Sequence, residues 1–139
     1  MSQTVGEVMQ SNPICLPAIT SITAAAVAMR DIGIGDVIVE EDGHVCGIVT
    51  DRDITVRVVA EAVYPNDVAL SDICSRELTA VGPTDSVEEV VKLMSNKALR
   101  RLPVLDQGRP VGIVSLGDLA VERDPDSVLA AISAAPPNV

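Results

Sequence analysis

The sequence predicts a mixed α/β fold of two repeated units, each with about three short strands and two main helices. A shift of the chain by 65 residues superposes these pairs without a gap: Met29 and Met94, Val39 and Val104, Gly43 and Gly108, Asp53 and Asp118. In both copies, strand-like apolar runs alternate with segments of helical spacing. Because one copy is too small to cover its own sheet, we expect the two to pack as a pseudo-twofold pair with a shared core.

Composition defines the chemistry of that core. The chain has 139 residues, of which 47% are hydrophobic, and its only aromatic residue of the Phe, Trp and Tyr set is Tyr64. The core is therefore expected to be aliphatic, and a chain of this length can bury one without disulfides or metals. No apolar run approaches the roughly 20 residues that span a bilayer, and signal-peptide features are lacking, so we expect a cytoplasmic protein.

Charge and cysteine content exclude several partners. The net charge of −10 at pH 7 argues against binding to nucleic acid and to anionic membrane surfaces, because both require a basic face. Cys15, Cys46 and Cys74 are an odd number without a Cys-x-x-Cys pattern. We therefore expect free, partly buried thiols rather than disulfides or a zinc site, although the sequence does not determine their redox state.

The first copy covers residues 1–64. Thr4 and either Thr20 or Ser21 are candidate helix N-caps, and Asp42-Gly43 is a two-residue hairpin signal. The expected elements are a helix over 5–9, a strand over 14–16, a helix from 22 to the glycines at 33 and 35, strands over 37–39 and 45–49, and a helix from 51 to about 62.

The second copy covers residues 65–124 and repeats this order after a short linker over 64–67. Either Asp85 or Ser86 caps its main helix, and Gln107-Gly108 forms the turn between its last two strands. The expected elements are a helix near 70–74, a strand over 79–81, a helix over 86–97, strands over 102–105 and 111–115 and a helix from 116 to about 123. Residues 125–139 are predicted to form a last helix, starting at Asp124-Pro125, and a frayed tail over 134–139.

One motif occurs in both copies, where a buried strand runs into a helix. The first motif is Gly47-Ile48-Val49-Thr50-Asp51-Arg52-Asp53 and the second is Gly112-Ile113-Val114-Ser115-Leu116-Gly117-Asp118. The free N–H groups and the dipole of a helix start favour a polar ligand there. A hydroxyl followed three residues later by an acid also resembles a capping box, which only starts a helix. Either motif alone leaves both interpretations open, and the duplication favours function.

With this repeat, this motif, and Arg101-Leu102-Pro103-Val104 ahead of a glycine turn, the chain resembles a tandem pair of cystathionine-β-synthase (CBS) domains, the Bateman module, over residues 5–123. The resemblance implies two βαββα-like units with a cleft on each side. It also implies a regulatory role and adenosine-containing ligands such as AMP, ADP, ATP or S-adenosylmethionine, with no required cofactor. The chain looks like a stand-alone, stress-associated bacterial pair whose regulated partner the sequence does not name.

The resemblance further implies two candidate pockets, each combining the hydroxyl and Asp of one copy with the first strand and helix end of the other. Pocket A consists of Thr50, Asp53, Thr79, Ala80, Val81, Leu99, Arg100, Arg101 and Pro103. Pocket B consists of Ser115, Asp118, Ile14, Cys15, Leu16, Ile34, Gly35, Asp36 and Ile38, with Arg52 near its phosphate region. A carboxylate can accept two hydrogen bonds from a ribose diol, and aliphatic side chains can enclose adenine.

Two departures from the family pattern distinguish the copies. Asp36 stands in the first copy where Arg101 stands in the second, and Gly117 stands where the first has Arg52. Since an acid repels phosphate and competes for an arginine, AMP is expected to prefer pocket A.

Three classes of function remain open at this point. Besides a ligand sensor, the chain fits a dimerising scaffold with empty clefts, because its acidity does not attract nucleotides at long range. An enzyme is the third class, but the only histidine, His44, adjoins a hairpin turn, and no Ser-His or Cys-His pairing or P-loop is present. The alanine-rich segments Ala24–Ala28 and Ala130–Ala134 predict close helix packing in a homodimer.

Overall fold

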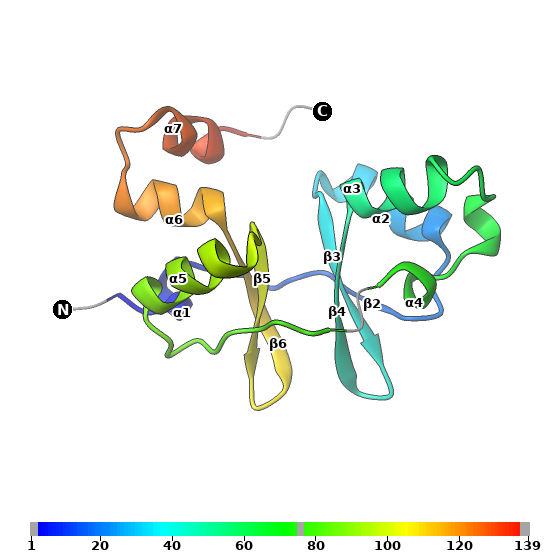
Figure 1. Ribbon diagram of the computed structural model, residues 1–139, viewed down its shortest axis with the longest axis horizontal. Helices are drawn as coiled ribbons and strands as arrows, with labels where there is room; N and C mark the ends of the chain where they lie inside the picture. Colours follow the sequence, from blue (N-terminus) through cyan, green and yellow to red (C-terminus); the bar gives the residue numbers. More distant parts are fainter. Residues whose placement is uncertain (1–2, 75–76, 137–139) are drawn as a thin grey trace. The chain divides into compact units, whose positions relative to one another are not determined.

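The computed structural model describes residues 3–74 and 77–136, which form two compact units (Figure 1). Unit 1 contains the described chain up to Pro13 together with the described chain from Thr79 onward. Unit 2 contains Ile14 to Leu78. Each unit has one three-stranded sheet, so the expected mixed fold with small sheets is confirmed. The compact units divide the chain differently from the sequence repeat, because residues 3–13 lie with the second copy.

Unit 2 is organised around the sheet β2-β3-β4, with strands Cys15–Pro17, Asp36–Glu41 and His44–Thr50. β2 runs parallel to β3, and β3 is antiparallel to β4. The helical segments are α2 (Ile22–Ile32), α3 (Asp51–Ile54), the π-helix η1 (Thr55–Val59), the 3-10 helix η2 (Pro65–Asp67) and α4 (Leu70–Ile73). The core is aliphatic, as composition required, and includes Ile22, Val37, Val39, Val49, Val58 and Leu70.

Unit 1 is organised around the sheet β1-β6-β5, with strands Gln10–Ser11, Arg109–Ser115 and Arg101–Asp106. Its helices are α1 (Val5–Val8), α5 (Val87–Lys97), α6 (Leu116–Arg123) and α7 (Val128–Ala134). Its buried residues include Val5, Val87, Val90, Leu102, Val104, Val114 and Leu119. Each unit therefore has an aliphatic cluster of its own.

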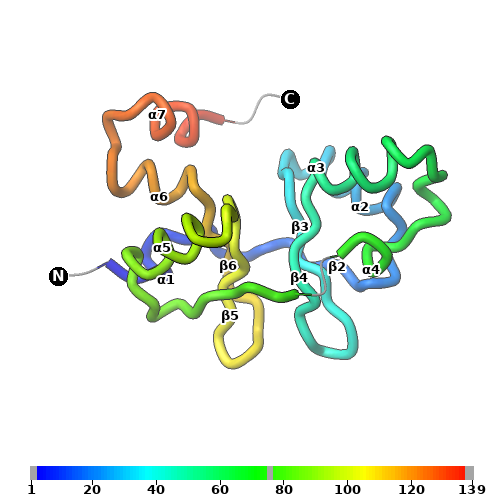
Figure 2. The backbone as a smooth tube through the Cα atoms, in the orientation of Figure 1, coloured from blue at the N-terminus to red at the C-terminus, as the bar shows by residue number. Residues whose placement is uncertain are grey.

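The predicted turns and main caps are confirmed. Both hairpins close through narrow loops (Figure 2), with φ values of 52° and 79° at Asp42-Gly43 and of 50° and 79° at Gln107-Gly108. Two consecutive positive φ angles match the twist of the flanking strands, which is why such residues favour tight hairpins. The Oγ atoms of Ser21 and Ser86 accept hydrogen bonds from the third following backbone N–H, at 3.1 and 3.2 Å. Of the alternatives offered by the sequence, these serines are the caps.

The strand predicted over Thr79–Val81 is wrong. Only Val81 pairs with its neighbour Val104, as an isolated bridge. The next residue in register to donate to β5 is Pro83, which has no N–H, and so the ladder stops after one residue. The Gly82 N–H donates to the Asp85 carboxylate at 2.8 Å. The third strand of this sheet is instead β1, which pairs antiparallel with β6.

Three helix predictions also need correction. Thr4 does not cap α1 with its side chain but donates to the Glu7 carboxylate at 3.1 Å. The last helix begins at Val128 rather than at Asp124-Pro125, since Ser127 Oγ accepts from the Ala130 N–H at 3.0 Å. The helix expected from Asp51 to about 62 changes after Ile54 into the wider turns of η1. Of the tail predicted to fray over 134–139, residues 137–139 lie outside the described residues.

Helix length bears on membrane association. Within residues 3–74 and 77–136, no helix combines the length and the apolar character needed to cross a bilayer.

We predict that Gly112→Ala destabilises the fold. A Cβ at Gly112 would lie 2.8 Å from the backbone oxygen of Gln10 and 2.5 Å from Met9 Sδ, because β1 passes close over β6. The expected loss is about 1–3 kcal/mol of unfolding free energy, typical of overpacking, measured by urea denaturation. Gly82→Ala is the control, because its Cβ would meet only ordinary contacts from 3.7 Å. An unchanged stability of Gly112→Ala would contradict the close approach of β1.

Candidate ligand-binding motifs

The first motif forms a complete capping box at the junction of β4 and α3. Thr50 Oγ1 accepts from the Asp53 N–H at 3.1 Å, and Asp53 Oδ2 accepts from the Thr50 N–H at 2.8 Å. The carboxylate is therefore held in one orientation by two reciprocal bonds. Asp53 is half-buried, and within the described residues its second oxygen, Oδ1, accepts no hydrogen bond. That oxygen is the acceptor which the first motif leaves available.

The second motif repeats the capping box at the junction of β6 and α6. Ser115 Oγ accepts from the Asp118 N–H at 3.2 Å, and Asp118 Oδ2 accepts from the Ser115 N–H at 2.9 Å. One contact has no equivalent in the first motif: Gln10 Nε2 donates to Asp118 Oδ1 at 2.9 Å. Both oxygens of Asp118 are thus engaged within unit 1. The capping interpretation holds for both motifs, and only Asp53 keeps an oxygen without a partner in the described chain.

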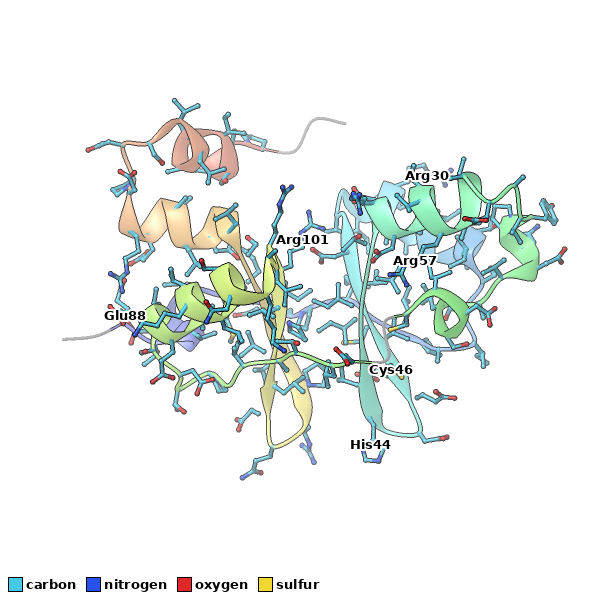
Figure 3. All side chains as sticks on the ribbon, viewed as in Figure 1. Arg30, His44, Cys46, Arg57, Glu88 and Arg101 are labelled. Carbon is cyan, nitrogen blue, oxygen red and sulfur yellow. The ribbon has the colours of Figure 1, made fainter. Side chains whose placement is uncertain are left out.

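Strand register places one charged residue opposite each motif. Asp36 is the partner of Thr50 across β3 and β4, and Arg101 is the partner of Ser115 across β5 and β6. The Arg101 side chain extends from the start of β5, away from the hairpin turn (Figure 3). Asp36 and Arg101 are the charged residues that differ between the copies. Within each unit, the sheet therefore places the differing residue directly beside that unit's own motif.

The residues predicted for pocket A belong to both units. Unit 2 supplies Thr50 and Asp53. Unit 1 supplies the remaining seven residues, among which Pro103 and Val81 are buried, Thr79, Ala80, Leu99 and Arg101 are half-buried and Arg100 is exposed. The Arg100 carbonyl accepts from the Leu116 N–H at 2.8 Å. This bond holds the end of the α5–β5 connection against the start of α6.

Lys97 is a residue that sequence reasoning missed. It lies in the last turn of α5, and its Nζ donates to Thr79 Oγ1 at 3.4 Å. A lysine in that position is usually assigned to the negative end of the helix dipole, so its spacing carried no signal of a site. Folding instead brings its charge next to a residue of the predicted pocket.

The predicted unit 2 half of pocket B follows β2 and the end of α2. Cys15 pairs with Ile38 across β2 and β3, and the Asp51 N–H donates to the Gly35 carbonyl at 2.9 Å. Ile14, Leu16 and Ile34 are half-buried against the unit 2 core, whereas Arg52 on α3 is exposed. Unit 1 supplies Ser115 and Asp118.

Within the described residues the cysteines form no disulfide, and two of them are poor nucleophiles. Burial raises the pKa of Cys74 to about 11, with further contributions from Cys46 and Asp53 that the Arg57 guanidinium opposes. Burial and the neighbouring Glu40 raise the pKa of Cys15 to about 11. A protonated thiol is a poor nucleophile, so neither residue is suited to covalent catalysis at neutral pH.

Arg57 ties the neighbourhood of Cys74 to η1. Its Nη1 donates to the Ile73 carbonyl at 2.8 Å, at the end of α4 (Figure 3). Arg57 thus has a structural contact that holds α4 in place beside the first motif.

Gly117 has a packing role. A Cβ at this position would lie 2.6 Å from Ser133 Oγ, because α7 packs on the first turn of α6 (Figure 1). The first copy has Arg52 at the equivalent place. Close packing of α7 therefore explains why a glycine replaces the basic residue.

Metal ligands do not gather in the described part of the chain. Among residues 3–74 and 77–136, no group of three His, Cys, Asp or Glu side chains is arranged to hold a metal ion. His44 is exposed at the β3–β4 turn (Figure 3).

Comparison with known families identifies the class to which these motifs belong. The CBS domain model matches residues 5–60 and 70–123. The chain therefore belongs to the CBS domain family and carries two tandem copies, and such pairs are typically regulatory modules.

Individual relatives agree with this assignment. Uncharacterized protein MK0525 of Methanopyrus kandleri is 38% identical over 120 residues, which cover 85% of this chain and 61% of that protein. The chain thus spans about three fifths of that relative. Hypoxic response protein 1 of Mycobacterium tuberculosis is 31% identical over 84% of this chain and 82% of its own length.

Solved structures show the same fold. A structure of Hypoxic Response Protein I with two coordinated zinc ions has a TM-score of 0.77 at 30% identity, over 86% of this chain and 98% of its own. The CBS domain pair of protein MJ0100, in complex with 5′-methylthioadenosine and S-adenosylmethionine, has a TM-score of 0.80 over 91% of this chain and 100% of its own. At 24% identity, that likeness concerns the fold alone.

Proposed function

We propose that the chain is a non-catalytic regulatory module that binds an adenosine-containing ligand through the first motif. The observation that carries this proposal is the carboxylate of Asp53. Its Oδ2 is fixed by the Thr50 N–H at 2.8 Å, while its Oδ1 accepts no hydrogen bond within the described residues. An oriented, half-buried acceptor of this kind suits the hydroxyl groups of a ribose. The pocket A residues predicted from the sequence remain the proposed site.

The cations of unit 1 favour a phosphate-bearing ligand over S-adenosylmethionine. Lys97 contacts Thr79, and Arg100 and Arg101 follow the same helix within four residues. Three positive charges on this segment attract phosphate and repel a sulfonium. AMP, ADP or ATP is therefore the proposed class.

We predict that Asp53→Ala weakens binding of AMP and of adenosine by about ten- to a hundredfold, as expected when a charge-assisted hydrogen bond to a hydroxyl is lost. Loss of the capping box alone would instead cost about 1 kcal/mol of stability. Calorimetric titration and thermal unfolding measure the two effects separately.

The matched control is Asp51→Ala, which removes an exposed acid from the same first turn of α3. It should leave both affinities unchanged. An Asp53→Ala variant with normal affinity and a lowered melting temperature would favour the scaffold interpretation, for which the completed capping boxes already provide a structural reason.

We predict that Lys97→Gln lowers the affinity for AMP by about two- to tenfold and leaves that for adenosine unchanged, since an exposed charge pair contributes modestly. Lys92→Gln removes a charge from the same helix, five residues earlier, and serves as the control. Equal losses for AMP and adenosine would contradict a role for Lys97 at the phosphate.

An apolar groove in unit 1 supports the proposal of a homodimer. The groove has a volume of about 350 Å³ and lies between α5 and α6. Its lining consists of Val91, Met94, Ser95, Leu99, Leu116, Leu119, Ala120 and Arg123. Two of these side chains, Val91 and Leu116, are each 46% exposed. A second copy that covered them would remove apolar surface from water.

The dimer prediction is a light-scattering mass of twice the 14.5 kDa chain at micromolar concentration. Val91→Glu should reduce that mass to the value for one chain, because the carboxylate would be buried without a partner. Ile19→Glu, at a site that is 86% exposed in unit 2, is the control and should remain dimeric. A wild-type mass equal to one chain would refute the proposal.

A further inference from the structure

The two motifs differ in one hydrogen bond, and that bond comes from the N-terminal segment. β1 pairs antiparallel with β6, with Gln10 opposite Ile113 and Ser11 opposite Gly112. This register places Gln10 near the start of α6, where Nε2 donates to Asp118 Oδ1 at 2.9 Å. Backbone pairing thus positions a side-chain donor on Asp118 Oδ1. Among the described residues, the equivalent oxygen of Asp53 in the first motif has no such partner.

This contact changes what the second motif can accept. In both motifs Oδ2 is committed to the capping N–H, so the remaining oxygen is the principal acceptor for an incoming hydroxyl. At Asp118 that oxygen already has an amide donor, and a ligand must displace Gln10 or share the oxygen with it. Because the Gln10 side chain is exposed, displacing its hydrogen bond to the charged oxygen weakens affinity by about tenfold.

The C-terminal helix α7 accounts for the missing basic side chain of the second motif, whereas the Asp118 carboxylate itself is engaged by Gln10. Ser133 on α7 approaches the position of Gly117 so closely that a Cβ there would lie 2.6 Å from Ser133 Oγ. The same Cβ would lie 3.7 Å from Ser115 Oγ, so α7 passes beside the hydroxyl of the motif. In the second motif, Ser133 therefore fills the space beside Gly117 that a basic side chain equivalent to Arg52 would need.

We infer that Gln10 is a specificity-determining residue that reserves the second motif, so that each chain takes one adenosine-containing ligand, at the first motif. This inference rests on the proposed function. It adds a stoichiometry and assigns a role to the N-terminal segment, which the sequence repeat had treated as part of the first copy.

A second glutamine provides a matched control. Gln3 also donates its amide to a carboxylate of α6, that of Glu122, which lies outside the motif. Gln3→Ala and Gln10→Ala therefore each remove one side-chain amide that donates to a carboxylate of α6 within unit 1. Neither change touches the backbone pairing of β1.

The experiment is native mass spectrometry of the full chain with AMP and, separately, adenosine, each at the concentration that just fills the first motif of the wild type. Wild type and Gln3→Ala should bind one ligand per chain, and Gln10→Ala should bind two. Asp53→Ala should remove the first ligand in every background. Asp118→Ala should leave wild-type binding unchanged and should remove only the second ligand of Gln10→Ala.

Several results would overturn the inference. Two ligands on the wild type, or one on Gln10→Ala, would show that Gln10 does not control the second motif. A single wild-type ligand that is lost in Asp118→Ala but kept in Asp53→Ala would refute the inference while leaving an adenosine-binding function in place. Absence of any AMP or adenosine binding by both wild type and Gln10→Ala would refute the proposed function as well.

Discussion

The reciprocal hydrogen bonds between a hydroxyl residue and the aspartate three positions later are the constraint on which both motifs depend. They end a buried strand, start a helix and fix the carboxylate through a backbone N–H at 2.8 Å in the first motif and 2.9 Å in the second. Because the cap uses only one carboxylate oxygen, the same side chain can also serve the proposed binding role. The two interpretations left open by the sequence are therefore compatible, and the proposed site lies at Asp53, whose second oxygen has no hydrogen-bond partner within the described residues.

The difference between the copies arises from what packs around equal motifs. In unit 1, β1 supplies Gln10 to Asp118, and α7 lies against Gly117. In unit 2, Asp53 has a neighbouring thiol, Cys74, whose pKa is raised chiefly by burial. A duplicated sequence thus gives two environments, because β1 from the first copy and α7, which follows the second copy, both pack in unit 1. The proposed functional asymmetry therefore rests on packing around the motifs.

Local signals in the sequence predicted much of the fold. Hairpins at Asp42-Gly43 and Gln107-Gly108, caps at Ser21 and Ser86, and the helix over 116–123 depend on interactions within a few residues. The strand over 79–81 and the start of α7 were predicted wrongly. A strand needs a continuous ladder of hydrogen bonds, which Pro83 interrupts because it has no N–H, and the helix start was decided by a competing cap at Ser127. The pocket residues taken from the family resemblance remain predictions.

By itself, the sequence determined the duplicated architecture, the aliphatic core and the positions of the two motifs, because periodicity, composition and turn chemistry are written in neighbouring residues. Only the tertiary structure decided that residues 3–13 join unit 1, that Lys97 reaches Thr79 and that Gln10 engages Asp118. These contacts join positions 18 and 108 residues apart in the last two cases. No local pattern encodes such pairs, since they form only when strand pairing and helix packing bring distant segments together.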